Sequence, residues 1–359
     1  MPALYGKSYS SEELRKRVGS LDQVGGVRKI ELADGPERGV EAFEFRTGGG
    51  LDFTVFAGRG MDIGAATYRS YPLAWVSQTG VPAASFFEPE GLGWLRGFHG
   101  GLIATCGLTY AGAAGPDGDE ELGLHGRISN LPAKNLSHGA SWHDDSYIMY
   151  AQGEMREASV FGPNMVMTRR ISSILGHPML HVQDVVENQG FRPQEHMLVY
   201  HCNFGFPLMD ENTILVAPDA EVRGQTDFAH ESIESHANFA PPTDIAERVY
   251  YHKLNASEDG NTMVAMINRE LGAGIGVALS YNVNMLPNLV QWKLPGRGEY
   301  VMGLEPANCL VEGRAKERDW GTLQVMEPGE TRTYDLTFSI YEGPEQLDQL
   351  VNAISALGA

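Results

Sequence analysis

The sequence predicts a mainly β protein, built as a large antiparallel sandwich or barrel. Short runs rich in β-branched and aromatic residues recur about every ten residues and are bounded by turn residues. The chain of 359 residues contains Gly 43 and Pro 19, which supply many turns. Neither an alternation of strands and helices nor a phosphate-binding loop is found, so a parallel nucleotide-binding sheet is not expected.

The length allows one large or two medium domains. We expect an N-terminal helical extension over residues 1–29, a β domain over residues 30–343 and a C-terminal helix over residues 344–359 packed on that domain. The hydrophobic fraction of 42% is enough for a substantial core.

Helices are expected only near the two ends of the chain. Residues 11–21 are predicted to be helical, because Ser10 or Ser11 can cap this segment and Glu12 and Glu13 suit the positive end of its dipole. Residues 344–357 place apolar side chains at helical spacing, at Leu347, Leu350, Val351, Ile354 and Leu357.

The intervening segments are expected to be strands, in the order VEAFEFRT, LDFTVFA, MDIGAATY, SYIMYAQGEM, VMTRRISSIL, MLHVQDVVEN, MLVYHCNFGF, NTMVAMINR, IGVALSYNV, LVQWKLP, EYVMGLEPANC and TLQVMEPGETRTYDLTFSIYE. RTGGGLDF is predicted to be a hairpin turn, because no Lys-Ser/Thr pair and no helix follow its glycines. PDGDEELG (116–123) and AHESIESHANFAPPTD (229–244) are expected to be polar surface loops.

Charge and cysteine content exclude several classes of partner. With 27 basic and 46 acidic residues the net charge is −19, which repels nucleic acids and anionic membrane surfaces. The three cysteines, Cys106, Cys202 and Cys309, form no CxxC pair and favour a reducing compartment. No signal peptide or membrane-spanning stretch is apparent. We therefore expect a soluble cytoplasmic protein whose oligomeric state stays open, a homodimer included.

Ionisable residues gather in four segments that lie next to strand ends: WLRGFHGGLIATCGL with Arg96 and His99, ELGLHGRISNLPA with His125 and Arg127, LVYHCNFGFPLM with His201 and Asn203, and YVMGLEPANCLVEGR with Glu305. A single histidine among apolar residues is more often a core residue than a catalyst. Glu305 follows a strand-like apolar run, where a carboxylate needs a purpose or a partner. One alternative for Glu305 is a salt bridge to Arg297 or Arg314.

A histidine and a carboxylate that face one cavity form an acid/base pair. Burial raises the pKa of a glutamate, and a histidine near neutral pH can hold or lose its proton. Such a pair moves a proton onto one atom of a substrate and takes one off another. Nearby arginines and an asparagine would hold oxygens of a polar ligand, and the candidates for this role are Arg127, Asn203 and His99.

The four segments resemble those of the aldose 1-epimerase (galactose mutarotase) superfamily, in the order found in that family. YHCNFGFPL resembles the family's His-Pro-Tyr-Phe strand, and GLHGR its Leu-His-Gly-Gly segment. RGFHGGLIATCGL is similar to Arg-Gly-Gly-Ile-Pro-Ile-Cys, and MGLEPANC to the Glu-Pro segment near the C-terminus. GRGMDIG (58–64) resembles a motif of a less characterised aldose-1-epimerase-like branch. The resemblance covers roughly residues 30 to 340.

This resemblance implies a β-supersandwich with an open concave face. It further implies that His201 is the general acid, Glu305 the general base and His125 a ligand-binding or assisting histidine. Arg96 and Arg59 would bind substrate. The sequence departs from the better-known members at Cys202, which follows the histidine, and at the inserted Phe98 and His99. These departures leave the identity of the sugar open.

The predicted activity is the interconversion of sugar anomers without a metal or cofactor. Aromatic side chains that could stack on a sugar are Trp75, Trp94, Trp292 and Tyr200, unless they pack in the core. Two other readings stay open. One is a metal-dependent sugar or sugar-acid isomerase or lyase that uses His99, His125, His201 and Glu305 as ligands. The other is a non-catalytic carbohydrate-binding protein.

Overall fold

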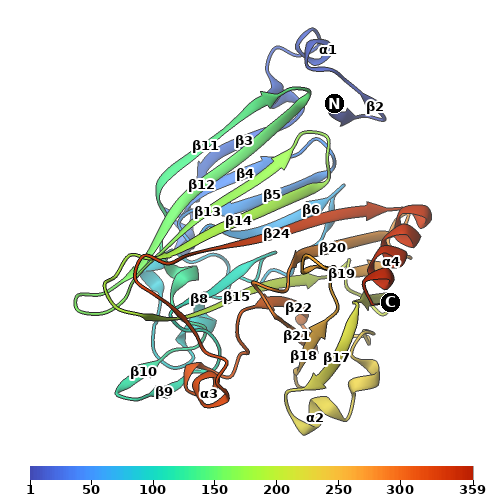
Figure 1. The fold of residues 1–359 in the computed structure, drawn as a ribbon. Helices are drawn as coiled ribbons and strands as arrows, with labels where there is room; N and C mark the ends of the chain where they lie inside the picture. Colours follow the sequence, from blue (N-terminus) through green and yellow to red (C-terminus); the bar gives the residue numbers. More distant parts are fainter. Residues whose placement is uncertain (359) are drawn as a thin grey trace.

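Antiparallel β-sheets dominate the computed structural model, which describes residues 1–358 (Figure 1). The largest sheet has eight strands, in the order β11 (Lys134–His143), β12 (Ser146–Ala158), β13 (Asn164–Ile174), β14 (Met179–Asn188), β24 (Thr331–Glu342), β20 (Ile275–Asn282), β19 (Asn261–Asn268) and β16 (Thr213–Val216). A five-stranded sheet contains β3 (Gly26–Glu31), β4 (Glu41–Arg46), β5 (Leu51–Phe56), β6 (Asp62–Tyr68) and β7 (Tyr71–Pro72).

A third sheet carries the segments singled out in the sequence. Its strand order is β17 (Asp219–Gly224), β18 (Arg248–Leu254), β21 (Asn288–Gly296), β22 (Glu299–Ala307), β15 (Gln194–Gly205) and β23 (Gln324–Met326), with β8 (Ala104–Leu108) also paired to β15. Two short hairpins complete the β structure, β1 (Ala3–Leu4) with β2 (Lys7–Ser8) and β9 (Gly115–Asp117) with β10 (Glu120–Leu122). The prediction of a mainly β, antiparallel protein is confirmed.

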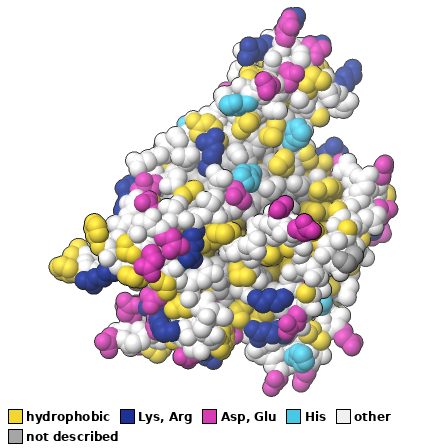
Figure 2. Space-filling model, in the orientation of Figure 1, with side chains coloured by type: hydrophobic (Ala, Val, Ile, Leu, Met, Phe, Trp, Pro, Cys, Tyr) yellow, Lys and Arg dark blue, Asp and Glu magenta, His cyan; other side chains and the backbone are white. Residues whose placement is uncertain are grey.

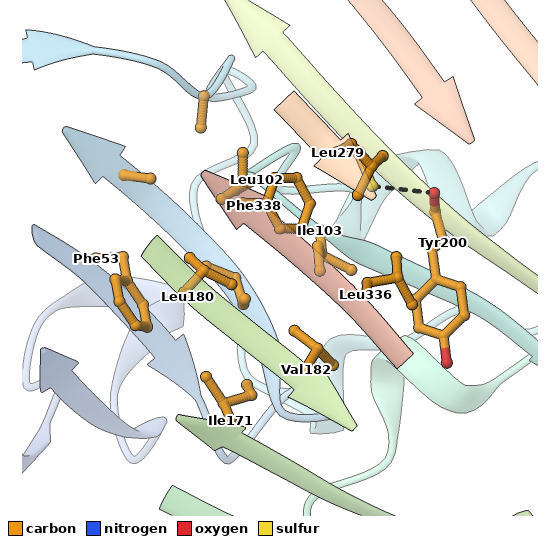
Figure 3. Packing of buried hydrophobic residues seen from close by; sticks show 14 of the residues in the cluster. Phe53, Leu102, Ile103, Ile171, Leu180, Val182, Tyr200, Leu279, Leu336 and Phe338 are labelled. Atoms are coloured by element: carbon orange, nitrogen blue, oxygen red, sulfur yellow. Dashed lines mark hydrogen bonds between the residues drawn. The ribbon is translucent and has the colours of Figure 1, made fainter. Parts of the chain in front are cut away.

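The strands form because apolar residues alternate with polar ones and one face of each is buried. Strand β14, MLHVQDVVEN, alternates half-buried and buried positions along its whole length. Figure 3 shows Leu180 and Val182 of β14 beside Leu336 and Phe338 of the neighbouring β24, all within the same core. Leu279 of β20 and Tyr200 of β15 reach this core from strands of different sheets, so the core joins the sheets.

Helices occupy the margins of the sheets. They are α1 (Ser11–Arg15), α2 (Asp227–His230), α3 (Arg314–Trp320) and α4 (Pro344–Leu357), with 3-10 turns η1 (Leu21–Gln23), η2 (Gly35–Glu37), η3 (Ala84–Phe86), η4 (Gly93–Gly97), η5 (Ile128–Asn130) and η6 (Ile233–Ser235). Helix α4 has the predicted bounds and buries Leu347, Leu350 and Ile354 against β19 and β20. The division of the chain at residues 29 and 343 remains a prediction.

The N-terminal helix is shorter than expected. A capping box between Ser10 and Glu13 begins α1, but the helix ends at Arg15 and not at Leu21. The side chain of Ser20 accepts a hydrogen bond from the backbone N–H of Asp22 and starts the separate turn η1. Ser20 therefore acts as an N-cap for a new turn instead of continuing α1.

The acidic segment 116–123 forms a hairpin that is held by salt bridges, whereas we expected a polar surface loop. It forms strands β9 and β10, and two arginines of α3 bind its carboxylates. Arg314 pairs with Asp117 and Glu120, and Arg318 pairs with Asp117. These charge-assisted contacts lower the pKa of Asp117 to about 2, the hydrogen bond from Arg318 being the largest cause.

A buried ionic network is joined to β15 through Tyr200. The guanidinium of Arg169 donates to both carboxylate oxygens of Asp184, at 2.8 and 2.6 Å, and to Asp62 at 3.2 Å. Tyr200 of β15 donates to Asp184 at 2.6 Å. Arg169, Asp184 and Asp62 are all fully buried, and their mutual pairing offsets the cost of removing three charges from water.

The surface reflects the negative net charge. Figure 2 shows acidic side chains scattered over the face turned to the viewer, with basic side chains between them. Among residues 1–358, no helix combines the length and the apolar character that a membrane crossing requires.

Candidate active site

His201 and Glu305 face each other across two adjacent strands. In the antiparallel pairing of β15 with β22, Val199 lies opposite Ala307 and Cys202 opposite Leu304, which sets His201 opposite Glu305. Directly opposed residues project from the same face of a sheet. Accordingly, Nε2 of His201 lies 3.2 Å from Oε1 of Glu305. The alternative salt bridge is wrong, because Arg297 pairs with Asp244 and Arg314 with the acidic hairpin.

Asn203 fixes the orientation and the tautomer of the His201 ring. Its amide nitrogen donates to the carbonyls of Gly101 and His201, at 3.0 and 2.9 Å, which assigns the amide oxygen to the side facing the ring. That oxygen lies 2.6 Å from Nδ1 of His201. An amide oxygen only accepts hydrogen bonds, so Nδ1 carries the hydrogen and Nε2 presents its lone pair to Glu305.

Asn203 was expected to bind substrate, but the structure gives it another task. Its side chain is fully buried and all its polar atoms are engaged within the protein. It is therefore a positioning residue for His201. The period of two along a strand puts residues 201 and 203 on the same face, which is the signal that could have identified this role.

Burial shifts the pKa values of this pair toward their uncharged forms. Desolvation lowers the pKa of His201 to about 4, and it raises the pKa of Glu305 well above its usual range, with Glu247 as a second cause. Both shifts favour the same uncharged form of the pair, a neutral imidazole beside a protonated carboxyl. The neighbour of Oε1 of Glu305 is Nε2 of His201 at 3.2 Å, and in this geometry the two atoms do not form a hydrogen bond.

Gly303 allows Glu305, Trp292 and His201 to pack closely around one point. It lies two residues before Glu305 on β22. A Cβ at this position would lie 2.7 Å from Oε1 of Glu305, 3.0 Å from Cβ of Trp292 and 3.4 Å from Cε1 of His201. Any larger residue would therefore crowd the three side chains that define the site. This glycine, in MGLEPANC, was not among the predicted site residues.

Aromatic rings surround His201. The ring centroids of Phe98 and Trp292 lie 5.2 and 5.3 Å from that of His201, and Trp94 lies at 6.5 Å. Trp75 packs edge-on against Trp292 at 6.2 Å. Three of the predicted aromatic residues, Trp75, Trp94 and Trp292, thus gather at the site. Tyr200 is part of the buried ionic network and points away from it.

His125 belongs to the same cluster. It lies in a tight turn with φ at 58°, and its ring centroid is 5.8 Å from that of His201 and 4.7 Å from that of Trp94. Its Nδ1 has no hydrogen-bond partner among residues 1–358. Burial lowers the pKa of His125 to about 3, and His201 contributes to this shift, so His125 is neutral at neutral pH.

Two of the predicted ligand-binding residues, Arg59 and Arg96, have protein partners other than His201 and Glu305. Arg59 is 1% exposed and donates one hydrogen bond from each of its nitrogens, to the carbonyls of Ser129, Pro82 and Gly97, so it ties loops together. Arg96 is exposed and pairs with Glu88 at 3.2 Å. Arg59 is thus a buried link between loops and Arg96 has a surface partner, and a substrate-binding role for either residue stays a prediction.

His99 and Arg127 also have neighbours other than the acid/base pair. His99 is 2% exposed, lies 3.9 Å from Asp62 and meets the edge of Phe56. Arg127 is exposed and lines a separate pocket together with Arg156, Glu157 and Arg314. The rival metal set of His99, His125, His201 and Glu305 does not assemble: within residues 1–358, only another trio brings three such ligand atoms within 4.8 Å of one another.

One protein-family model matches this chain. The model of a family described as a domain of unknown function, DUF4432, matches residues 37–340, which is most of the chain. The chain belongs to the DUF4432 family. No functionally curated protein matched this DUF4432 chain.

Solved structures show which fold this DUF4432 protein has. It is similar to a candidate aldose 1-epimerase from Klebsiella pneumoniae, with a TM-score of 0.88 and 23% identity over 94% of this chain and 91% of that one. A galactose 1-epimerase from Lactobacillus acidophilus has a TM-score of 0.59 and 11% identity, covering 89% and 100% of the two chains. A galactose mutarotase-like protein from Clostridium acetobutylicum has a TM-score of 0.62 and 11% identity, covering 89% and 99%. The DUF4432 chain thus has the galactose mutarotase type of β-supersandwich, as the sequence predicts.

Proposed function

We propose that this protein is a cofactor-independent isomerase that interconverts the α and β anomers of a sugar. The observation that carries the proposal is the contact of 3.2 Å between Nε2 of His201 and Oε1 of Glu305. A carboxyl group and an imidazole, which can serve as an acid and a base, meet at this contact, and Asn203 orients the imidazole. The fold shared with a galactose 1-epimerase supports the same reaction class.

The pair holds one mobile proton besides the one on Nδ1 of His201. In the resting state burial places this proton on Glu305. Its transfer across the 3.2 Å contact gives a carboxylate and an imidazolium with the same number of protons. A bound sugar brings hydroxyl groups that replace lost hydration, and it thereby makes the charged form accessible without exchange of protons with solvent.

The charged form performs ring opening. The Glu305 carboxylate takes the proton from the anomeric hydroxyl while the His201 imidazolium donates its Nε2 proton to the ring oxygen. The C1–O5 bond breaks, and C1 becomes an aldehyde. After rotation about C1–C2, closure from the opposite face reverses both transfers and restores the pair. Positioned acid/base groups contribute roughly 10²–10⁴-fold, an adequate scale for a reaction that also proceeds in water.

The surrounding residues have subsidiary tasks in this proposal. Trp75, Trp94 and Trp292 offer ring faces to the C–H groups of a pyranose. Nδ1 of His125, which has no partner among the described residues, is placed to bond a sugar hydroxyl. The imidazole of His125 acts as a neutral hydrogen-bonding group in this setting, because burial lowers its pKa to about 3.

The test is to follow optical rotation or anomeric NMR signals of freshly dissolved α-D-glucose and α-D-galactose with and without the protein. We expect catalysis of at least one sugar, and Glu305→Gln should abolish nearly all of it. Glu299→Gln, on the exposed start of the same strand, is the matched control and should retain activity. Retention of most activity by Glu305→Gln would refute the role of this carboxyl. Tight sugar binding with no rate increase would indicate a binding protein.

A further inference from the structure

A second cluster of ionisable side chains lies on the other face of the sheet that carries His201 and Glu305. Asp219 begins β17, His252 lies in β18 and His236 follows η6 in the connection between these strands. In β21, Trp292 lies beside His201, while its neighbour Gln291 contacts His252. Consecutive strand residues point to opposite faces, so this cluster is separate from the candidate active site.

The three side chains converge on one point. Nδ1 of His252 lies 2.7 Å from Oδ1 of Asp219, and Nε2 of His236 lies 3.7 Å from Oδ2 of the same carboxylate. All three ligand atoms lie within 4.8 Å of one another. Two ligands of a tetrahedral Zn²⁺ ion, each about 2.0–2.1 Å from the metal, are about 3.3 Å apart. Small side-chain adjustments would therefore complete a metal-binding geometry.

In both His236 and His252, the ring nitrogen that points away from Asp219 faces a hydrogen-bond acceptor. Nδ1 of His236 lies 2.7 Å from the carbonyl of Ile233, which can only accept, so this nitrogen carries the hydrogen. Nε2 of His252 lies 3.0 Å from Oε1 of Gln291, whose amide nitrogen donates to the carbonyl of His236 at 2.8 Å. The neutral forms of both rings thus direct a bare lone pair at the carboxylate of Asp219.

Two lone pairs and a carboxylate facing one point need a positive charge between them. Outer-shell acceptors that fix the tautomer in this way are a regular feature of metal-ligating histidines. The ammonium of Lys293, on the same face, bonds to the carbonyls of Ser235 and Asn238 and is not paired with Asp219. His252 is buried, whereas Asp219 and His236 are about one-fifth exposed, which leaves a direction for a further ligand.

We propose that Asp219, His236 and His252 form a binding site for a divalent transition-metal ion such as Zn²⁺. Imidazole ligands favour Zn²⁺ and its first-row neighbours over Ca²⁺ or Mg²⁺. The ion ties the connection over residues 225–247 to the edge of the sheet, because one ligand comes from that connection and two from β17 and β18. Its role is structural, since the acid/base pair lies on the opposite face.

The test uses the full-length protein after removal of metals by chelator and dialysis. Calorimetric titration with Zn²⁺ should give one ion per chain, and Zn²⁺ should raise Tm. Co²⁺ should give the visible absorption bands of a site with nitrogen and oxygen ligands. His236→Gln and Asp219→Asn should each weaken Zn²⁺ binding at least tenfold and remove the Zn²⁺-dependent rise in Tm. His177→Gln, at an exposed histidine outside the cluster, should bind as the wild type does.

Circular dichroism identifies a variant that fails to fold, and His236→Gln, at the partly exposed ligand, then decides the outcome. Absence of stoichiometric Zn²⁺ binding by the wild type would overturn the proposal and leave a proton-bridged His–Asp–His cluster. Undiminished binding by both variants would overturn it too. Neither result bears on sugar isomerisation, which depends on His201 and Glu305.

Discussion

Nδ1 of His201 lies 2.6 Å from Oδ1 of Asn203, two residues further along the same strand. This contact determines which nitrogen of the ring faces Glu305. The orientation of the acid/base pair is therefore a property of a five-letter stretch, YHCNF, and of the Gly101 carbonyl that holds the amide.

Substitution of Asn203 tests this positioning role. In Asn203→Ala the ring loses its fixed orientation, and we expect kcat to fall on the order of 10²-fold while KM changes little. In Asn203→Asp a carboxylate faces Nδ1, which favours the imidazolium and raises the pKa of His201. The acidic limb of the pH–activity profile should then move to higher pH. A merely structural role for Asn203 would lower stability without moving that limb.

The wild-type activity should stay high over a broad pH range and fall at both the acidic and the alkaline end of that range. As pH falls through about 4, His201 gains a proton while Glu305 keeps its own, and the pair has no base left. As pH rises through the raised pKa of Glu305, the pair loses its mobile proton and has no acid. Measurement of kcat/KM against pH, after subtraction of the spontaneous rate, checks this. Activity that increases below pH 4 would contradict it.

Gly303→Ala should damage the site without unfolding the protein. The added Cβ would lie 2.7 Å from Oε1 of Glu305, so the carboxyl must move away from His201. We expect a loss of activity on the order of 10²-fold and a cost in unfolding free energy of about 1–3 kcal/mol. Gly139→Ala is the control, because its Cβ would meet Tyr150 at an ordinary 3.5 Å. Full activity of Gly303→Ala would show that the space is not used.

Arg169→Met should destabilise the fold strongly. It leaves the carboxylates of Asp184 and Asp62 buried without their cation, which costs about 3–5 kcal/mol. Urea unfolding followed by circular dichroism measures the change in free energy. Arg192→Met, at an exposed position, should change it by less than about 0.5 kcal/mol. Equal stability of the two variants would mean that the ionic network adds nothing to the free energy of unfolding.

The fold was predictable because many strands can be recognised from the alternation of apolar and polar residues in their own segment. Alternating burial in β12 and β14 follows directly from the pattern of apolar residues. Strands such as β3, GVRKIE, and β11, KNLSHGASWH, were not identified, because few of their residues are apolar and their stability comes from pairing with neighbours.

The site was predictable in part. His201, Glu305 and His125 come together as their order in the chain and the resemblance suggested. The burial of Arg59 was not predictable, because two of its three carbonyl partners lie 70 and 38 residues away, and no local pattern shows where a buried guanidinium finds them. The trio of Asp219, His236 and His252 was not predicted, since its members are spread over two strands and the polar connection between them, and strand pairing brings them together.

The alternation along β21 links the two clusters in one further respect. Gln291 and Trp292 are adjacent, yet one serves the histidine cluster and the other the aromatic wall beside His201. Deletion or insertion of a single residue within this strand would turn both side chains over at once. Changes in chain length among relatives should therefore be confined to the connections, and a one-residue shift in β21 should disable both faces together.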